Sequence, residues 1–82
     1  MKLPVIRHLQ KNNEQEKLEH TLEVLESITE HRSVTENDMD VIGELITNIC
    51  GAIEVHEMID GGMAEKDAAN SFAKKVMGSI DR

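Results

Sequence analysis

The stretch from Thr35 to Gly62 limits what this chain can fold into more than any other part of it. Its apolar side chains recur every three or four residues, as on one face of an α-helix: Ile42, Leu45, Ile46, Ile49, Ile53 and Ile59. Thr35 and Asp38 precede this run as a variant of the capping box, with Asp in place of Glu or Gln. Gly61-Gly62 follows it and is typical of a helix stop, because glycine takes the left-handed C-cap conformation without strain. The sequence therefore predicts a helix over residues 35–60.

Two glycines, Gly43 and Gly51, lie inside this predicted helix, and each costs it about 1 kcal/mol relative to alanine. With Thr47 they form a row of small residues four apart, on roughly the opposite side from the isoleucines. Such a row leaves a shallow groove that another backbone can approach closely. We therefore expect Gly43, Thr47 and Gly51 to form a close-packing face against a helix of the same or a second chain. The alternative is that the glycines are tolerated on a solvated face, or mark a kink.

Three further segments have helical patterns, and no segment has the alternation of a β-strand. A short first helix starts at Pro4, whose missing N–H is not needed in a first turn. A second helix is predicted over residues 14–31, and its apolar residues share one face: Leu18, Leu22, Leu25, Val24 and Ile28. A fourth is predicted over residues 64–79, and its apolar face consists of Ala69, Phe72, Ala73, Val76 and Ile80. Short turns make sequential helices antiparallel neighbours. We predict a single all-α domain over residues 1–82, a small bundle of three long helices and a short N-terminal helix, with the third helix central.

The size of the chain makes its stability marginal. It has 82 residues, and Phe72 is its only aromatic residue. Small domains often need disulfides, metals or oligomerisation, and Cys50 is the only cysteine, so no disulfide can form within the chain. We therefore expect a homodimer. A single cysteine and the absence of a signal-peptide-like or membrane-spanning apolar run predict a cytoplasmic protein.

The charge is unevenly distributed. The net charge is −7, and residues 14–60 alone carry thirteen acidic and two basic side chains. This balance argues against nucleic acid and against an anionic membrane as partners, since both require a basic face. It permits a basic protein partner, or docking of the basic ends of the chain on its acidic middle.

Five glutamates in the second helix step by three and four residues along one stripe: Glu16, Glu19, Glu23, Glu26 and Glu30. One interpretation is an acidic interaction face for a basic partner, or a weak cation site. The other, which we favour, is a solvated face, because carboxylates along one straight helix cannot wrap a calcium ion.

Cys50 lies between Ile49 and Gly51, close to the apolar side of the third helix. Free cysteine usually packs as a small hydrophobe, so we expect it in the core. The adjacent glycine could give access to the sulfur, so Cys50 is also a candidate reactive thiol.

Sites for metals and catalysis have little support in the sequence. None of the four histidines has a glutamate three residues before it, as helical di-iron sites do. No nucleophile elbow or glycine-rich phosphate loop is present. We predict no catalytic, cofactor-binding or metal residues, and no cofactor.

Four segments, MKLPVIRHL, DVIGELITNICGAIEV, EMIDGGM and NSFAKKVMGSID, resemble a family of short, acidic, uncharacterised helical proteins from Bacteroidota-type bacteria. The likeness covers nearly the whole chain, and the second helix is its least distinctive part. No activity is assigned to that family, so the resemblance implies no functional residue.

From these observations we expect a non-enzymatic protein-interaction module or homodimer with an unidentified protein partner. An accessory role in thiol redox chemistry through Cys50 is the alternative, and a metal-binding helical protein is a weaker one.

Overall fold

The computed structural model describes residues 2–80, with side chains up to Val76. Its described part consists of four helices, α1 (Leu3–Asn12), α2 (Gln15–Thr29), α3 (Glu36–Asp60) and α4 (Glu65–Ile80). The all-α prediction is confirmed, and each expected helix ends within two residues of its predicted limit. α3 is about 37 Å long at 1.5 Å per residue, and the three extensive helix pairings each join it to one other helix. The third helix is therefore central, as expected.

Local signals set the ends of α3. The Thr35 hydroxyl accepts the Asp38 N–H, and the Asp38 carboxylate accepts the Thr35 N–H, each at 3.1 Å, which completes the predicted capping box. At the other end, the N–H of Gly62 donates to the carbonyl of Ile59, and that of Met63 donates to that of Met58. This pair of bonds is the Schellman arrangement, with Gly62 as its left-handed residue at φ 113°.

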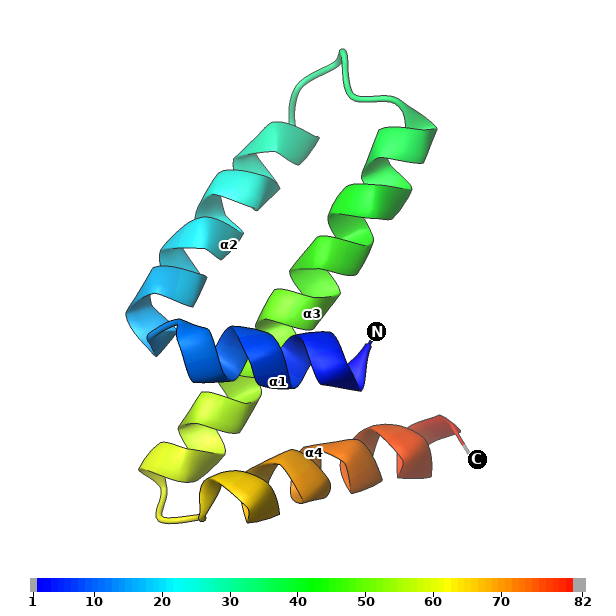
Figure 1. Ribbon diagram of the computed structural model, residues 1–82. Helices are drawn as coiled ribbons and strands as arrows, with labels where there is room; N and C mark the ends of the chain where they lie inside the picture. The colour runs from blue at the N-terminus through cyan, green and yellow to red at the C-terminus, as the bar shows by residue number, and fades with distance from the viewer. Residues whose placement is uncertain (1, 81–82) are drawn as a thin grey trace.

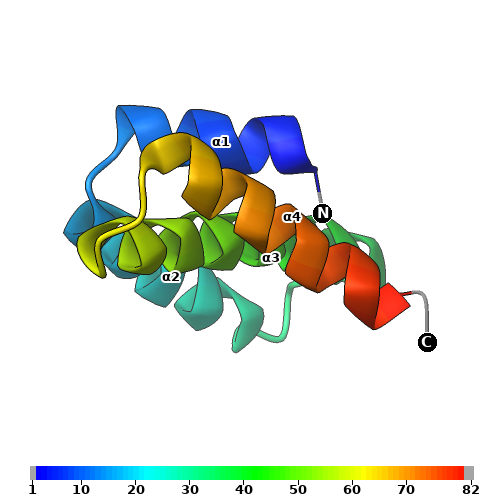
Figure 2. The ribbon, with the colours of Figure 1, turned by 90° about the horizontal axis from the view of Figure 1, so that it is seen from below.

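The helices form two layers. α2 and α3 run antiparallel as a long hairpin, while α1 crosses in front of α3 and α4 runs across its C-terminal end (Figure 1). Seen from below, α1 and the hairpin lie on different levels (Figure 2). The molecule is accordingly flat, with extents of 42 × 32 × 17 Å. The antiparallel relation predicted for all neighbours describes α2 and α3, whereas α1 and α4 cross the hairpin obliquely.

The core lies where α1, α2 and α4 meet the C-terminal half of α3. Its buried side chains come from all four helices: Ile6, Leu18, Ile49, Ala52, Val55, Ala68 and Phe72. The other half of α3, over residues 36–47, contains no buried residue. Of the predicted apolar face of α4, Ala69 and Phe72 are buried, and the side chain of Ile80 lies outside the described residues. The core therefore supports only one end of the hairpin.

Candidate functional site: an open apolar face on the hairpin

Two hydrogen bonds at opposite ends of α1 fix where it crosses α3. The backbone N–H of Lys2 donates to the buried Asn48 side chain at 2.9 Å. Nε2 of His56 donates to the carbonyl of Asn13, just beyond the end of α1, at 2.8 Å. α1 therefore covers α3 from Asn48 to His56 and leaves the same face bare before Asn48.

Val41 and Leu45 lie on that bare continuation. They precede Asn48 by seven and three residues, so all three share one side of α3. Asn48 is 4% exposed beneath the start of α1, whereas Leu45 is 46% and Val41 60% exposed. The stripe that forms the core at one end of α3 is thus uncovered at the other.

The second helix of the hairpin adds Val24 and Ile28, 60% and 41% exposed. The side of α2 on which Val24 and Ile28 lie can be inferred from the position of Glu26. The Glu26 carboxylate raises the pKa of the Cys50 thiol, so Glu26 lies on the side of α2 that is near Cys50. Cys50 lies on the flank of α3 opposite Asn48, so Glu26 marks the side of the hairpin away from α1. Val24 and Ile28 lie on the flank of α2 opposite Glu26, and they therefore face the same side as α1.

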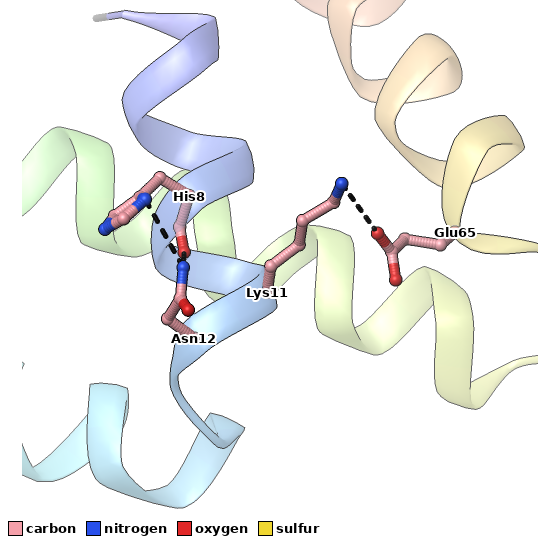
Figure 3. Close-up of polar contacts among 4 residues, drawn as sticks. All are labelled: His8, Lys11, Asn12 and Glu65. Carbon is pink, nitrogen blue, oxygen red and sulfur yellow. Dashed lines mark hydrogen bonds and ion pairs between the residues drawn. The ribbon is translucent and has the colours of Figure 1, made fainter.

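One flank of α1 borders this surface. Lys11 pairs with Glu65 at the start of α4 at 3.6 Å (Figure 3), so the flank that carries Lys11 faces α4. Val5 lies on the opposite flank and is partly exposed. We call Val5, Val24, Ile28, Val41 and Leu45 together the open face. It forms a step, with the hairpin as floor and α1 as wall.

The open face lies on a strongly acidic part of the molecule. Residues 23–47, the distal half of the hairpin, contain seven acidic side chains and one arginine, a net charge of −6. Within the described structure, the ion pair of this half joins Glu44 to Lys2 at 3.8 Å, and both side chains are largely exposed. Three of these acidic side chains, Glu23, Glu26 and Glu30, lie on the far and outer sides of α2, so the acidic residues on the side of the open face belong to α3, Glu44 among them.

The structure separates the three residues of the expected close-packing face. A Cβ on Gly51 would lie 2.8 Å from Cδ1 of Ile6 and 3.0 Å from the Phe72 ring, so here α3 packs closely against α1 and α4 of its own chain. Gly43 has nothing within 4 Å of such a Cβ. Thr47 is exposed, and its hydroxyl donates to the Gly43 carbonyl. The expectation of one continuous groove is thus wrong, and Gly51 belongs to the core side of α3 rather than to the side opposite it.

The glutamates of the acidic stripe, Glu16, Glu19, Glu23, Glu26 and Glu30, are all exposed. None of their carboxylates lies within ion-pair distance of a basic side chain in the described part of the chain. They lie on the far and outer sides of α2, away from the open face.

Cys50 is exposed, so the expectation that it packs in the core is wrong. Its position, one residue beyond the buried Ile49, turns it by about 100° out of the interface with α2. Partial burial, and second the Glu26 carboxylate, raise the pKa of its thiol. This thiol is therefore accessible but less easily ionised than a free cysteine.

The remaining features are modest. Among residues 2–80, no three His, Cys, Asp or Glu side chains form a group that could hold a metal ion. A mostly apolar hollow between α1 and α4 has Arg7 and Asn70 among its polar lining. His8 and Asn12 contact each other on α1 (Figure 3), and the Asn12 side chain also donates to the His8 carbonyl at 2.8 Å, which helps to end the helix.

Sequence reasoning did not identify the open face. It placed Leu45, Val24 and Ile28 on the apolar stripes of their helices, whereas Val24 and Ile28 lie on a flank of α2 beside its buried stripe and all three are exposed. The signal that could have revealed the face was length. A first helix of 10 residues cannot cover one side of a helix of 25 residues.

The described helices include none that is long and apolar enough to cross a membrane. No curated protein and no solved structure is significantly similar to the chain. One family model does match, over residues 1–81, and its description is a family of unknown function, DUF6952. This match agrees with the resemblance to an uncharacterised family, while the Bacteroidota origin stays a prediction. The chain belongs to the DUF6952 family.

Proposed function

We propose that this chain is a non-enzymatic protein-interaction module that binds a partner protein in the cytoplasm through its open face. One observation carries the proposal: five aliphatic side chains are 39–60% exposed, and their positions on the helices place them on the side of the hairpin that α1 crosses. Contiguous exposed apolar surface is typical of interaction sites, whereas scattered exposed residues are not. The surface also lies in a step between two helical layers, and such a step offers more contact area than a flat face.

Site-specific photocrosslinking in cells of the source organism tests this proposal. A photoactivatable side chain at Leu45 should give an adduct with a second protein, while the same group at Met39 should not. Met39 is a matched control, because it is 42% exposed on the same half of α3 but lies on the flank of Cys50. Equal labelling from both positions, or none from Leu45, would contradict the proposal. An adduct of twice the chain mass would instead assign the face to a homodimer.

Thiol chemistry at Cys50 is a second candidate function, because the thiol is exposed. Its raised pKa weighs against a thiolate that reacts readily near neutral pH. A mixed disulfide trapped in cells under oxidising stress, lost in Cys50→Ser, would support this function. Labelling of Cys50 only after denaturation would exclude it.

A further inference from the structure

The shape of the open face favours a helix as its occupant. The floor consists of two i, i+4 ridges, Val24 with Ile28 and Val41 with Leu45, and a helix packs its own ridges into such grooves. An extended peptide would need a sheet edge with unpaired backbone groups, whereas the backbone here is paired within helices α2 and α3. α1 already shows how a helix packs across α3.

The dimensions of the floor set the length of that helix. A helix laid beside α1 crosses both α2 and α3, each about 10 Å wide, so it contacts the floor over roughly 13 residues. α1 itself crosses α3 with 10 residues. Apolar side chains at i, i+3 or i+4, and i+7 of the bound helix would meet the floor and the Val5 wall, and its other side would remain in water.

Charge decides between the sources of such a helix. The distal half of the hairpin has a net charge of −6. Glu23, Glu26 and Glu30 carry part of it on the far side of α2, and Glu44 lies beside Lys2 at the start of α1, so the half as a whole attracts a helix with lysines and arginines along its polar flanks. A second copy of this chain would place its own negatively charged hairpin against this one, and the two would repel each other. Glu44 shares a loose ion pair with Lys2, which a cation of the incoming helix can replace.

We propose that the open face binds a cationic amphipathic helix of a partner protein, laid on the hairpin beside α1. This inference rests on the proposed function and names the chemistry of its partner. Electrostatic attraction speeds the encounter and selects the sign of charge, and the aliphatic floor supplies the contact that holds the bound helix.

Three synthetic peptides of about 14 residues, long enough to cross the floor, separate these contributions. The first has an aliphatic stripe with lysines on its polar side, the second has the same stripe with glutamates, and the third is a scrambled form of the first without a stripe. Each is titrated into isotope-labelled protein at about 150 mM salt, where distant charges are largely screened, and chemical-shift changes are recorded by NMR.

The cationic amphipathic peptide should bind at least about tenfold more tightly than either of the others. Its shift changes should centre on Val24, Ile28, Val41 and Leu45. Leu45→Gln and Val41→Gln should each weaken binding by about fivefold or more, since each removes an apolar contact from the floor, while Met39→Gln should leave it unchanged. Both test positions are largely exposed, so these variants should fold normally.

The other outcomes overturn the inference in distinguishable ways. Equal binding of the glutamate peptide would remove the charge requirement but leave the open face as a helix-binding site, so the proposed function would survive. Equal binding of the scrambled peptide would show non-specific attraction of cations. A protein that is dimeric through this face at the NMR concentration, or a peptide that maps elsewhere, would overturn the helix proposal outright.

Discussion

At the scale of single residues, the two glycines inside α3 have different surroundings, so an added methyl group should have opposite effects on stability at the two positions. A methyl group at Gly51 would overlap with Ile6 and press on Phe72, which are both almost fully buried, so they can give way only by displacing other core side chains. A methyl group at Gly43 meets open space. We expect Gly43→Ala to stabilise the fold by up to about 1 kcal/mol, through helix propensity. Gly51→Ala should destabilise it by about 1 kcal/mol, because overpacking outweighs the same propensity gain.

Urea unfolding monitored by circular dichroism checks this pair, and each variant is the control for the other. A stabilised Gly51→Ala would show that α1 and α4 do not approach α3 as closely as the structure has them.

The sequence predicted close packing for both glycines, and the structure shows it at Gly51 but not at Gly43. Residues 43 and 51 are eight positions apart, which rotates their directions by about 80° on an α-helix. Only Gly51 also lies in the half of α3 that α1 and α4 cross. The periodicity gave the direction of each residue, whereas the crossing points depend on contacts between distant parts of the chain.

The rate at which the Cys50 thiol reacts should depend on pH in a definite direction. Because burial and Glu26 raise the pKa of its thiol, the thiolate fraction below that pKa is smaller than for a free cysteine. Labelling of the native protein with Ellman's reagent should go to completion, at a rate that still rises with pH at the ordinary cysteine pKa of about 8.5. Glu26→Gln removes a negative charge from the thiol's surroundings, so it should lower the pKa and speed labelling. Glu23→Gln serves as control, and an unchanged rate in Glu26→Gln would contradict the assignment of the charge effect.

At the scale of helices, Asn48 holds α1 in place. Its side-chain oxygen accepts the N–H of Lys2 across 46 positions of sequence, and it is the first residue of α3 that α1 covers. Asn48→Leu should therefore cost about 1 kcal/mol for the lost hydrogen bond. The loss should be local, because α2 and α3 keep their own contacts.

Hydrogen exchange followed residue by residue measures this. In Asn48→Leu the amides of α1 should lose protection while those in the C-terminal half of α3 keep most of theirs. Thr47→Leu, one residue earlier at an exposed position, is the matched control. Uniform loss across all helices would mean that α1 does not open separately.

The ends of the helices were predictable because their causes are local. Thr35, Asp38 and Gly62 bond within four residues of themselves, and the sequence shows such signals directly. The angle at which α1 and α4 cross the hairpin was not predictable, because it depends on Gly51, Asn48 and His56 meeting residues more than 20 positions away. The candidate site follows from that crossing. Its residues were therefore recognised as apolar in the sequence, but their exposure was not.

At the scale of the whole molecule, the buried core lies at one end of a flat body and most of the negative charge lies at the other. The core lies under the C-terminal half of α3, while the distal half of the hairpin carries a net charge of −6 and little buried surface. In the described part of the chain, three exposed or partly exposed ion pairs oppose this repulsion, and they join Lys2 to Glu44, Lys11 to Glu65 and Lys75 to Glu54. Such surface pairs contribute little each.

Repulsion should therefore exceed attraction in the net effect of charge on stability. The four neighbouring glutamate pairs of α2 alone cost a few tenths of a kcal/mol each, and salt screens them. For a domain of this size, about 1 kcal/mol corresponds to a rise in Tm of roughly 4–8 °C, so we expect a rise of a few degrees between low salt and about 0.5 M sodium chloride. The double variant Glu23→Gln, Glu26→Gln should unfold at a higher temperature in low salt and respond less to added salt, because it lacks part of the repulsion. A Tm that falls as salt is added would show instead that the ion pairs outweigh the acidic half, and the field that is proposed to select a cationic partner would then be weaker than the charge count implies.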